Sequence, residues 1–281
     1  MPAPIRTRDA LLGIVLAIVA LVAAQLAAQL VYLLPLTPAT AHALFGGAYV
    51  LVAGVLLVLP CRVVLHLSPA DCRIGRPVLP ARWLLAAILL PVGVSLALIT
   101  LPGDWAYHPA AAGELAPKLT QALLATGLAV GAVEEMVFRG VILSALERRW
   151  NRWVAVLFPS MLFGLLHALG AELGLADIAL LFVAGTSVGV MFSLITLESG
   201  SVWPAAVVHG LWNALMIGGI LHIGPDTNPD ALLSYRLSVS SPVLTGGSFG
   251  VESSLFAVIG YLVVSAAAVP GLLRRRRSSN T

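Results

Sequence analysis

Six side chains that could do chemistry stand inside otherwise apolar stretches of this sequence. They are Glu134, Glu135, Arg139, His167, His209 and Asn213. Ionisable groups in such surroundings are expensive to desolvate, so each is a functional-site candidate by default. A carboxylate beside an imidazole can take a proton from water and turn it into a nucleophile. A second imidazole and an amide can donate hydrogen bonds to the oxyanion that forms on an attacked carbonyl.

Spacing assigns different parts to the two adjacent glutamates. Glu135 and Arg139 are four residues apart, so a helix places them on one face. The acid precedes the base, which is the favourable order for an ion pair within a helix. Each would neutralise the other, which makes their burial tolerable. Glu134 points about 100° away on the same helix and is the carboxylate left over. The plain alternative is one buried ionic cluster of all three, but such a cluster does not need a second glutamate.

The two histidines each share a helix face with a second motif residue. Phe163 precedes His167 by four residues, and Asn213 follows His209 by four. A single helical histidine is more often a packed, satisfied side chain than a functional one. Depth argues for a common site. Glu134 and His167 each lie roughly 21 Å of helix from the predicted cytoplasmic ends of their helices, and His209 and Asn213 lie about 10–18 Å in from the loop at 198–201. We therefore expect these groups to meet in the middle to cytoplasmic part of the membrane.

The same residue types could also bind a metal ion. Glu134, His167 and His209 would form a zinc set with a fourth position left for water. The compact H-E-x-x-H spacing of zinc peptidases is missing, which favours a metal-free site without deciding the question. The residues alone are compatible with a metal-free hydrolase of amide bonds and with a zinc-dependent one.

At these residues the chain closely resembles the CPBP family of intramembrane endopeptidases, the CAAX-protease and bacteriocin-processing (Abi) family. Three motifs in order carry the resemblance: E-E-x-x-x-R at 134–139, F-x-x-x-H at 163–167 and H-x-x-x-N at 209–213. The lead-in Gly200-Ser201-Val202-Trp203 is also similar to the family's approach to the third motif. Each motif is weak alone, but the three together are specific. They cover about residues 120–215, and the outer helices match only in being hydrophobic.

The resemblance implies an eight-helix membrane protein that hydrolyses peptide bonds near the membrane surface. Carried over by position, Glu134 would activate the water with His167, and His209 and Asn213 would form the oxyanion hole. Glu135, Arg139 and Phe163 would support the site. The expected partners are the lipid bilayer and a peptide or protein substrate, for which membrane-anchored and prenylated chains are both compatible. No cofactor is favoured, zinc is the alternative, and no nucleic-acid partner is expected.

The elements that must position these residues are membrane helices. The 281-residue chain is 59% hydrophobic and only 10% charged, too few charges to cover a soluble globule. Apolar runs long enough to span a bilayer predict about eight helices in one all-α transmembrane domain, 1–281, with a motif-bearing core near 117–222. The expected helices lie near 10–34, 41–60, 83–103, 118–146, 153–171, 178–197, 199–225 and 253–273. Dyad alternation typical of a membrane barrel is missing, and 223–252 is expected to be a polar loop.

Basic residues predict the orientation of this bundle. With eight helices, 13 of the 16 basic residues fall on one side, Lys118 and Arg236 fall on the other, and Arg139 lies within a helix. Cytoplasmic loops carry the basic excess, so both termini are expected to be cytoplasmic. Cys61 and Cys72 then lie on the reducing side, and their spacing matches no zinc or redox motif.

Other functions remain as alternatives to a protease. A non-catalytic membrane scaffold or bacteriocin self-immunity protein could share the fold. A transporter would also use buried ionisable groups, but it predicts broken helices or inverted repeats that are not clear in the sequence. A serine protease centred on Ser248 is disfavoured because this residue falls in the polar loop. Gly185 and Gly189 are expected to allow close helix packing rather than to form a dimer face.

Overall fold

The computed structural model describes residues 5–169 and 172–278, with side chains described up to Arg274. The end of the expected helix 153–171 and the side chains of the arginines at 275–277 therefore lie outside the described part.

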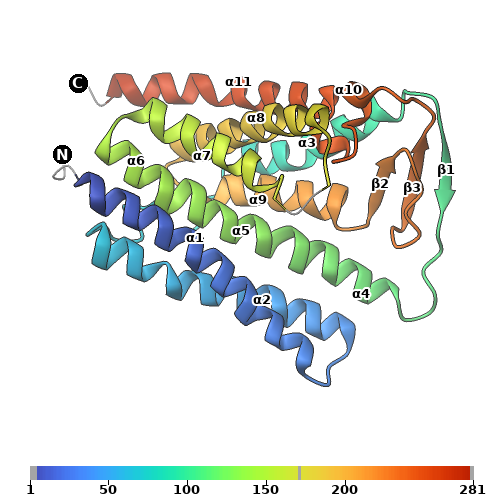
Figure 1. Ribbon diagram of the computed structural model, residues 1–281, viewed down its shortest axis with the longest axis horizontal. Coiled ribbons are helices and arrows are strands. Elements are labelled where there is room, and N and C mark those ends of the chain that lie inside the picture. The colour runs from blue at the N-terminus through green and yellow to red at the C-terminus, as the bar shows by residue number, and fades with distance from the viewer. Residues whose placement is uncertain (1–4, 170–171, 279–281) are drawn as a thin grey trace.

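Helices dominate the described chain, in agreement with the expected all-α membrane fold (Figure 1). In chain order they are α1 (Thr7–Gln29), η1 (Leu30–Leu33), α2 (Pro38–Leu56), η2 (Leu59–Val64), α3 (Ala81–Leu98), α4 (Leu115–Thr120), η3 (Gln121–Ala129), α5 (Val130–Glu135), η4 (Met136–Ile142), α6 (Leu143–Arg149), α7 (Arg152–Leu166), α8 (Leu175–Ser199), α9 (Trp203–Trp212), η5 (Asn213–Ile217), α10 (Pro242–Thr245), η6 (Val251–Ser253) and α11 (Leu255–Ser278). The five elements α4 to α6 follow one another without interruption as one long helical stretch, in which η3 and η4 are wide π-turns.

Within the described part of the chain, five helical stretches are long and apolar enough to cross a membrane: Thr7–Leu33, Pro38–Val64, Ala81–Leu98, Leu175–Ser199 and Leu255–Arg274. The predicted number of eight spans stays a prediction, since the stretch α4–α6 carries charges and α7 and α9 are short. The expected corner at residues 35–38 is confirmed. There α2 begins at Pro38, and the side chain of Thr37 accepts a hydrogen bond from the backbone N–H of Thr40.

Two expectations for the seventh helix and the polar loop are wrong. The helix expected over 199–225 ends at Ile217, because Gly218 and Gly219 follow and Gly219 adopts a left-handed φ of +84°. Beyond it the chain forms a small sheet of β1 (Gly103–Tyr107), β2 (Leu221–Gly224) and β3 (Leu233–Leu237) in the order β1-β3-β2. β1 pairs antiparallel and β2 parallel with β3. Strands of four or five residues are too short to be recognised from an alternation of apolar and polar residues in the sequence.

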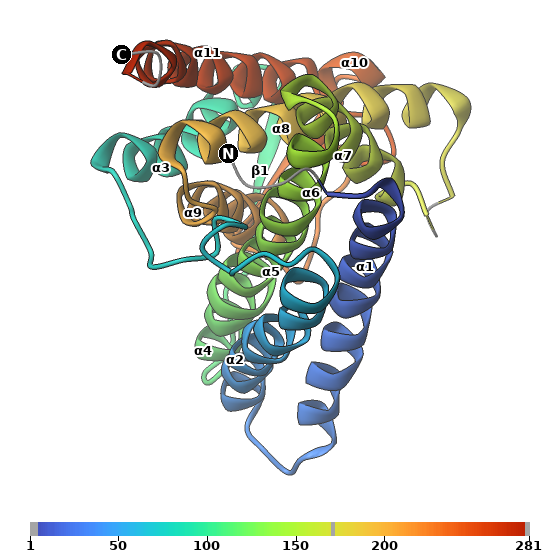
Figure 2. The same ribbon diagram turned by 90° about the vertical axis from the view of Figure 1, so that its left-hand side faces the viewer.

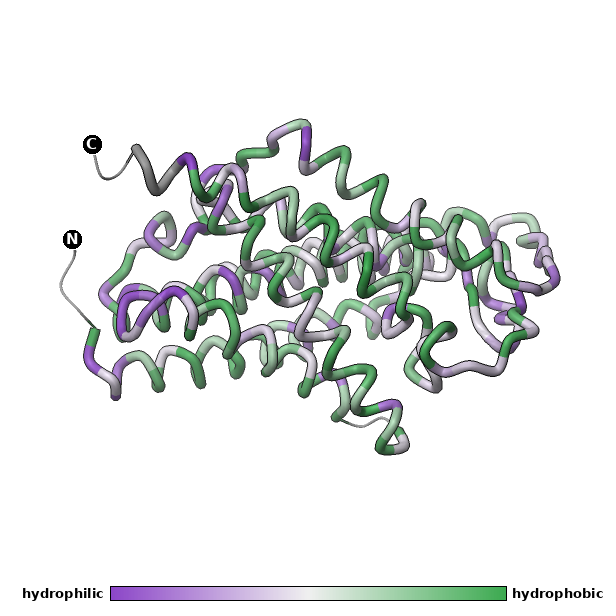
Figure 3. The backbone as a smooth tube through the Cα atoms, turned by 90° about the horizontal axis from the view of Figure 1, so that it is seen from above, coloured by the Kyte–Doolittle hydropathy of each residue, from purple (hydrophilic) through white to green (hydrophobic). Residues whose placement is uncertain are grey.

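The helices pack into two groups on either side of the long stretch α4–α6. Seen end-on, α1 and α2 lie on one side, and α3, α8, α9 and α11 lie on the other (Figure 2). Both termini lie at one end of the bundle and the sheet lies at the other (Figure 1). Hydrophilic residues gather toward these two ends, and the middle of the bundle is mostly hydrophobic (Figure 3), as expected of helices that cross a bilayer.

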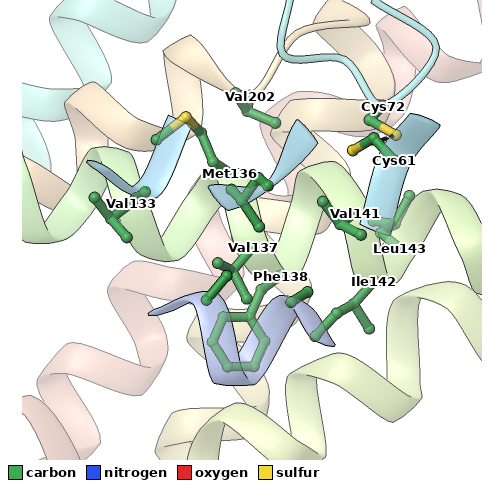
Figure 4. Packing of buried hydrophobic residues seen from close by; sticks show 14 of the residues in the cluster. Cys61, Cys72, Val133, Met136, Val137, Phe138, Val141, Ile142, Leu143 and Val202 are labelled. Carbon is green, nitrogen blue, oxygen red and sulfur yellow. Dashed lines mark hydrogen bonds between the residues drawn. The ribbon is translucent and has the colours of Figure 1, made fainter. Parts of the chain in front are cut away.

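The buried apolar side chains form two clusters that correspond to these groups. One joins α1 and α2 to residues 125–146 and α7, and the other joins α3, α8, α9 and α11. Figure 4 shows part of the first cluster, with Val133, Val137 and Phe138 inside it and Cys61 beside Cys72. Both cysteines are buried free thiols, with their sulfur atoms 3.5 Å apart.

Glycines let the helices that carry the expected site approach at backbone contact. A Cβ on Gly131 of α5 would stand 2.8 Å from the backbone nitrogen of Gly210 on α9. A Cβ on Gly185 of α8 would stand 2.5 Å from the Cα of Gly164 on α7. The close-packing interpretation of the Gly185 and Gly189 pair is thus supported. These contacts hold the helices of the first and third motifs together and hold the helix of the second motif against α8.

Replacing Gly131 by alanine should test this packing. We expect Gly131→Ala to lower the free energy of unfolding by about 1–3 kcal/mol, because its methyl group meets backbone that must move. Gly54→Ala on α2 is the matched control, since a Cβ there has open space. It should be neutral or stabilising by up to about 1 kcal/mol. Denaturation in detergent measures both, and equal unfolding of the two variants would contradict the packing described here.

Candidate active site

The Glu135 carboxylate is the centre of the site. It is wholly buried, and its Oε1 accepts hydrogen bonds from Nη1 of Arg139 at 2.9 Å and from Nδ1 of His209 at 3.1 Å. The first contact is the helical ion pair that the spacing predicts. The second joins α5 to α9, which the sequence did not predict.

Arg139 is likewise wholly buried; both of its Nη atoms donate hydrogen bonds, whereas its Nε has no partner within the described chain. Its Nη2 donates to the carbonyl oxygen of Gly189 at 3.2 Å, which connects it to α8. The guanidinium carbon lies 4.8 Å from the ring centre of Phe163, 5.1 Å from that of Phe192 and 5.6 Å from that of Phe138. Such contacts with aromatic faces stabilise a desolvated cation. Arg139 is therefore enclosed between helices and does not line the cavity described below.

The ring of His209 has a defined orientation. Its Nδ1 faces the Glu135 carboxylate, which can only accept, so this nitrogen carries the hydrogen and donates. Nε2 then faces Glu134, whose Oε2 lies 3.8 Å away. The ring of Phe192 stacks on the imidazole with centres 4.8 Å apart and planes 17° apart. The hydrogen bond at Nδ1 and the stacked Phe192 ring thus fix the imidazole, and Nε2 is the ring nitrogen that faces Glu134.

Glu134 is the carboxylate left without a partner of its own, as its spacing predicts. Its side chain is 18% exposed, and its Oε2 is buried without a hydrogen bond within the described chain. The 3.8 Å to Nε2 of His209 is longer than a hydrogen bond and can be bridged by a water molecule. A buried carboxylate oxygen with unused acceptor capacity is suited to take a proton from such a water.

His167 stands apart from this group. It follows the last residue of α7, its Nδ1 donates to the carbonyl oxygen of Phe163 at 2.7 Å, and the residue is exposed. Between Glu134 and His167 the described structure holds no hydrogen bond or ion pair. Phe163 lies between the two imidazoles, with ring centres 4.5 Å from His167 and 5.9 Å from His209. The expected cooperation of Glu134 and His167 therefore needs a bridging molecule.

A cavity of about 70 Å3 connects three of the four expected catalytic residues. His167, His209 and Asn213 all line it, whereas Glu134 reaches it only through His209. The Nδ2 of Asn213 donates to the carbonyl oxygen of Thr126 at 3.4 Å, and the side chain is buried. The cavity lies where the two apolar clusters meet, since Phe163 belongs to one and Trp212 to the other.

Sequence reasoning missed the residues that complete the cavity from the C-terminal part of the chain. These are Phe249, Glu252, Ser253 and Tyr261. Glu252 was expected only as the last residue of the polar loop 223–252. Burial raises the pKa of this carboxyl to about 7, although His209 opposes the change. The residues lie in the polar segment before α11 and within its first turns, where no spacing in the sequence marks them.

Among the described residues, no three His, Cys, Asp or Glu side chains are placed to hold a metal ion. Glu134 and His209 lie close together, but the imidazole of His167 makes no polar contact with either of them within the described chain. We therefore assign no chemical step to zinc.

Comparison with known families agrees with the three motifs. Residues 116–215 match the family described as type II CAAX prenyl endopeptidase Rce1-like. The match spans all three motifs and their six polar residues, and it confirms the resemblance of this segment to the CAAX-protease family. Comparison with curated proteins and with solved structures gives no match.

Replacing Arg139 should show how strongly the buried Glu135 carboxylate destabilises the fold when it has no ion-pair partner. Arg139→Met leaves Glu135 charged and buried, so we expect the free energy of unfolding to fall by about 3–5 kcal/mol. The double variant Glu135→Gln/Arg139→Met removes both charges and should recover part of that loss.

Arg236→Met is the matched control for this measurement. Arg236 forms an exposed pair with Asp104 at 3.5 Å, and its loss should change stability by less than about 1 kcal/mol. Chemical denaturation in detergent reads out all three variants. A single variant Arg139→Met as stable as Arg236→Met would show that the Glu135–Arg139 pair does not hold the site.

Proposed function

We propose that this protein is an intramembrane endopeptidase of the CAAX-protease/Abi type that hydrolyses peptide bonds with a glutamate-activated water. One observation carries the proposal: the unpartnered carboxylate of Glu134 lies 3.8 Å from the fixed imidazole of His209 inside an apolar bundle. The match of residues 116–215 supports a peptide or protein in the membrane as the substrate class. Prenylated and unmodified chains both fall within that class.

In the proposed reaction, Glu134 takes a proton from water as the water oxygen attacks the carbonyl carbon of the scissile bond. The oxygen of that carbonyl becomes an oxyanion, which accepts hydrogen bonds from an N–H at Nε2 of His209 and from Nδ2 of Asn213. The C–N bond then breaks, and the proton held by Glu134 passes to the leaving nitrogen. We assign to His167 the orientation of the attacking water from the opposite wall of the cavity.

The position of the cavity bears on the side from which a substrate arrives. The cavity is lined near the start of α11 by Phe249, Glu252, Ser253 and Tyr261, and α11 runs from there to the end that carries both termini (Figure 1). The sequence predicts cleavage near the cytoplasmic face. If both termini are cytoplasmic, as the arginines predict, the cavity lies instead in the middle or in the opposite half of the bilayer. We propose that the substrate reaches it from the half that carries the sheet.

Cysteine labelling should fix this orientation. Arg8 is exposed beside the N-terminus, and Asp230 is exposed next to the sheet. An impermeant maleimide applied to intact cells should label Asp230→Cys at once and Arg8→Cys only after permeabilisation. The unaltered chain is the control, since Cys61 and Cys72 are buried. The reverse labelling order would overturn the predicted orientation.

Glu134→Ala should abolish proteolysis without unfolding the protein. We expect cleavage to fall by roughly 10²- to 10⁴-fold, the usual effect of losing a general base. The measurement compares the termini of membrane proteins in cells with the unaltered protein, without it, and with Glu134→Ala. Peptides that change together in the last two conditions identify the substrate class.

Glu172→Ala is the matched control, because Glu172 is an exposed acid outside the site. It should leave the termini as they are in the unaltered strain. Cleavage that continues at the original rate in Glu134→Ala would overturn the proposal. A cellular phenotype that depends on the protein but not on Glu134 would favour the non-catalytic scaffold or self-immunity alternative.

A further inference from the structure

The cavity has a second wall that the matched family segment does not supply. Residues 116–215 contribute the motif side chains, whereas Phe249, Glu252, Ser253 and Tyr261 come from the segment before α11 and from its first turns. The Tyr261 hydroxyl donates to the backbone oxygen of Glu252 at 3.2 Å, which fixes this segment against α11. Because these residues lie outside the matched segment, they can give this protein a substrate preference that the family motifs do not determine.

Glu252 is a carboxylate without a partner on that wall. Within the described chain its carboxylate has no hydrogen bond and no ion pair, and the residue is only partly exposed. Removing a carboxylate from water without a compensating donor is costly. Burial accordingly raises the pKa of Glu252 to about 7. A ligand with a positive charge next to Glu252 would favour the ionised form of its carboxyl group.

Ser253 gives an independent sign of an unfilled polar site. The residue is 2% exposed and lines the same cavity, yet its Oγ has no hydrogen-bond partner within the described structure. Buried hydroxyl groups in proteins are almost always hydrogen-bonded. Two adjacent residues that line the cavity, one with an anionic and one with a neutral polar side chain, thus have unused hydrogen-bonding capacity.

Within the described chain, no side chain that lines the cavity forms a hydrogen bond or an ion pair with the Glu252 carboxylate, and His209 acts on it only through space. The other titratable side chains that line the cavity are His167, His209 and Tyr261. Nδ1 of His209 is already bonded to Glu135, and Nδ1 of His167 is bonded to the backbone of Phe163. Tyr261 directs its hydroxyl to the Glu252 backbone. The complement that the cavity lacks is a cationic hydrogen-bond donor.

The aromatic lining suits the stem of such a donor. Phe249 approaches His167 with ring centres 6.5 Å apart, and Tyr261 packs against Trp212 with ring centres 5.3 Å apart. Methylene groups pack favourably on such rings while an ammonium group at their end reaches a polar partner. The compact ammonium of lysine suits a cavity of about 70 Å3 better than the wide guanidinium of arginine.

We propose that Glu252 and Ser253 form a specificity pocket for the ammonium group of a lysine side chain next to the scissile bond. This inference rests on the proposed peptidase function. The lysine ammonium donates to the Glu252 carboxylate and to the Ser253 Oγ. Glu252 and Ser253 select the substrate and take no part in bond breaking.

The test begins with the Glu134-dependent termini from cells. Synthetic peptides are made across these cleavage sites, each with lysine, norleucine or glutamate at the positions flanking the bond. Membrane vesicles that contain the full-length protein cleave them, and kcat/KM is measured for each. At one flanking position we expect lysine to exceed norleucine by roughly tenfold or more, chiefly through a lower KM.

Variants then assign that preference to the pocket. Glu252→Gln should reduce the ratio of lysine to norleucine to near one, and Glu252→Lys should favour glutamate instead. Ser253→Ala should lower the ratio by a few-fold, and it decides the matter if the Glu252 variants do not fold. Asp230→Asn, which removes an exposed acid outside the cavity, should keep the unaltered ratio.

The possible failures are distinct from one another. If no termini depend on Glu134, the proposed function fails and the pocket assignment falls with it. If Glu134-dependent cleavage shows no lysine preference at any flanking position, the pocket assignment alone is overturned. A lysine preference that survives in both Glu252→Gln and Ser253→Ala would likewise overturn it, and the peptidase would stand.

Discussion

The buried carboxylate of Glu135 is the interaction on which the site depends. One oxygen accepts from Arg139 on the same helical stretch and from His209 on α9. A carboxylate at the centre of an apolar bundle is unfavourable without such partners. Loss of either donor, Arg139 or His209, would therefore destabilise the fold as well as the site. Because the contact fixes Nδ1 of His209, it also decides that Nε2 is the nitrogen that meets Glu134.

The rest of the architecture brings this contact together. Two apolar clusters, one around α1 and α2 and one around α3, α8, α9 and α11, meet along the long stretch that carries Glu135. Gly131 and Gly210 allow α5 and α9 to touch backbone to backbone, which sets the reach of His209. Arg139 joins the same stretch to α8 through the carbonyl of Gly189. The carboxylate thus links three helices at one point, and the cavity opens beside it.

Much of this could be predicted from local rules. The i,i+4 spacing predicts the Glu135–Arg139 pair and leaves Glu134 unpaired, and charge-free runs locate most of the helices. Contacts between distant segments could not be predicted, because a spacing rule acts only within one helix. The bond from His209 to Glu135, the stacking of Phe192 and the approach of Glu252 to the cavity all depend on how helices pack. The short strands escaped notice for the same reason, since pairing with one another stabilises them.

The orientation of the His209 ring is the most direct measure of this account. The protein has six histidines, and nitrogen NMR of ¹⁵N-histidine-labelled protein in bilayers reports which ring nitrogens carry hydrogen. The spectrum of His209→Gln identifies the signals that belong to His209. We predict that Nδ1 of His209 carries hydrogen and donates to Glu135. A His209 ring with hydrogen on Nε2 and none on Nδ1 would contradict the account.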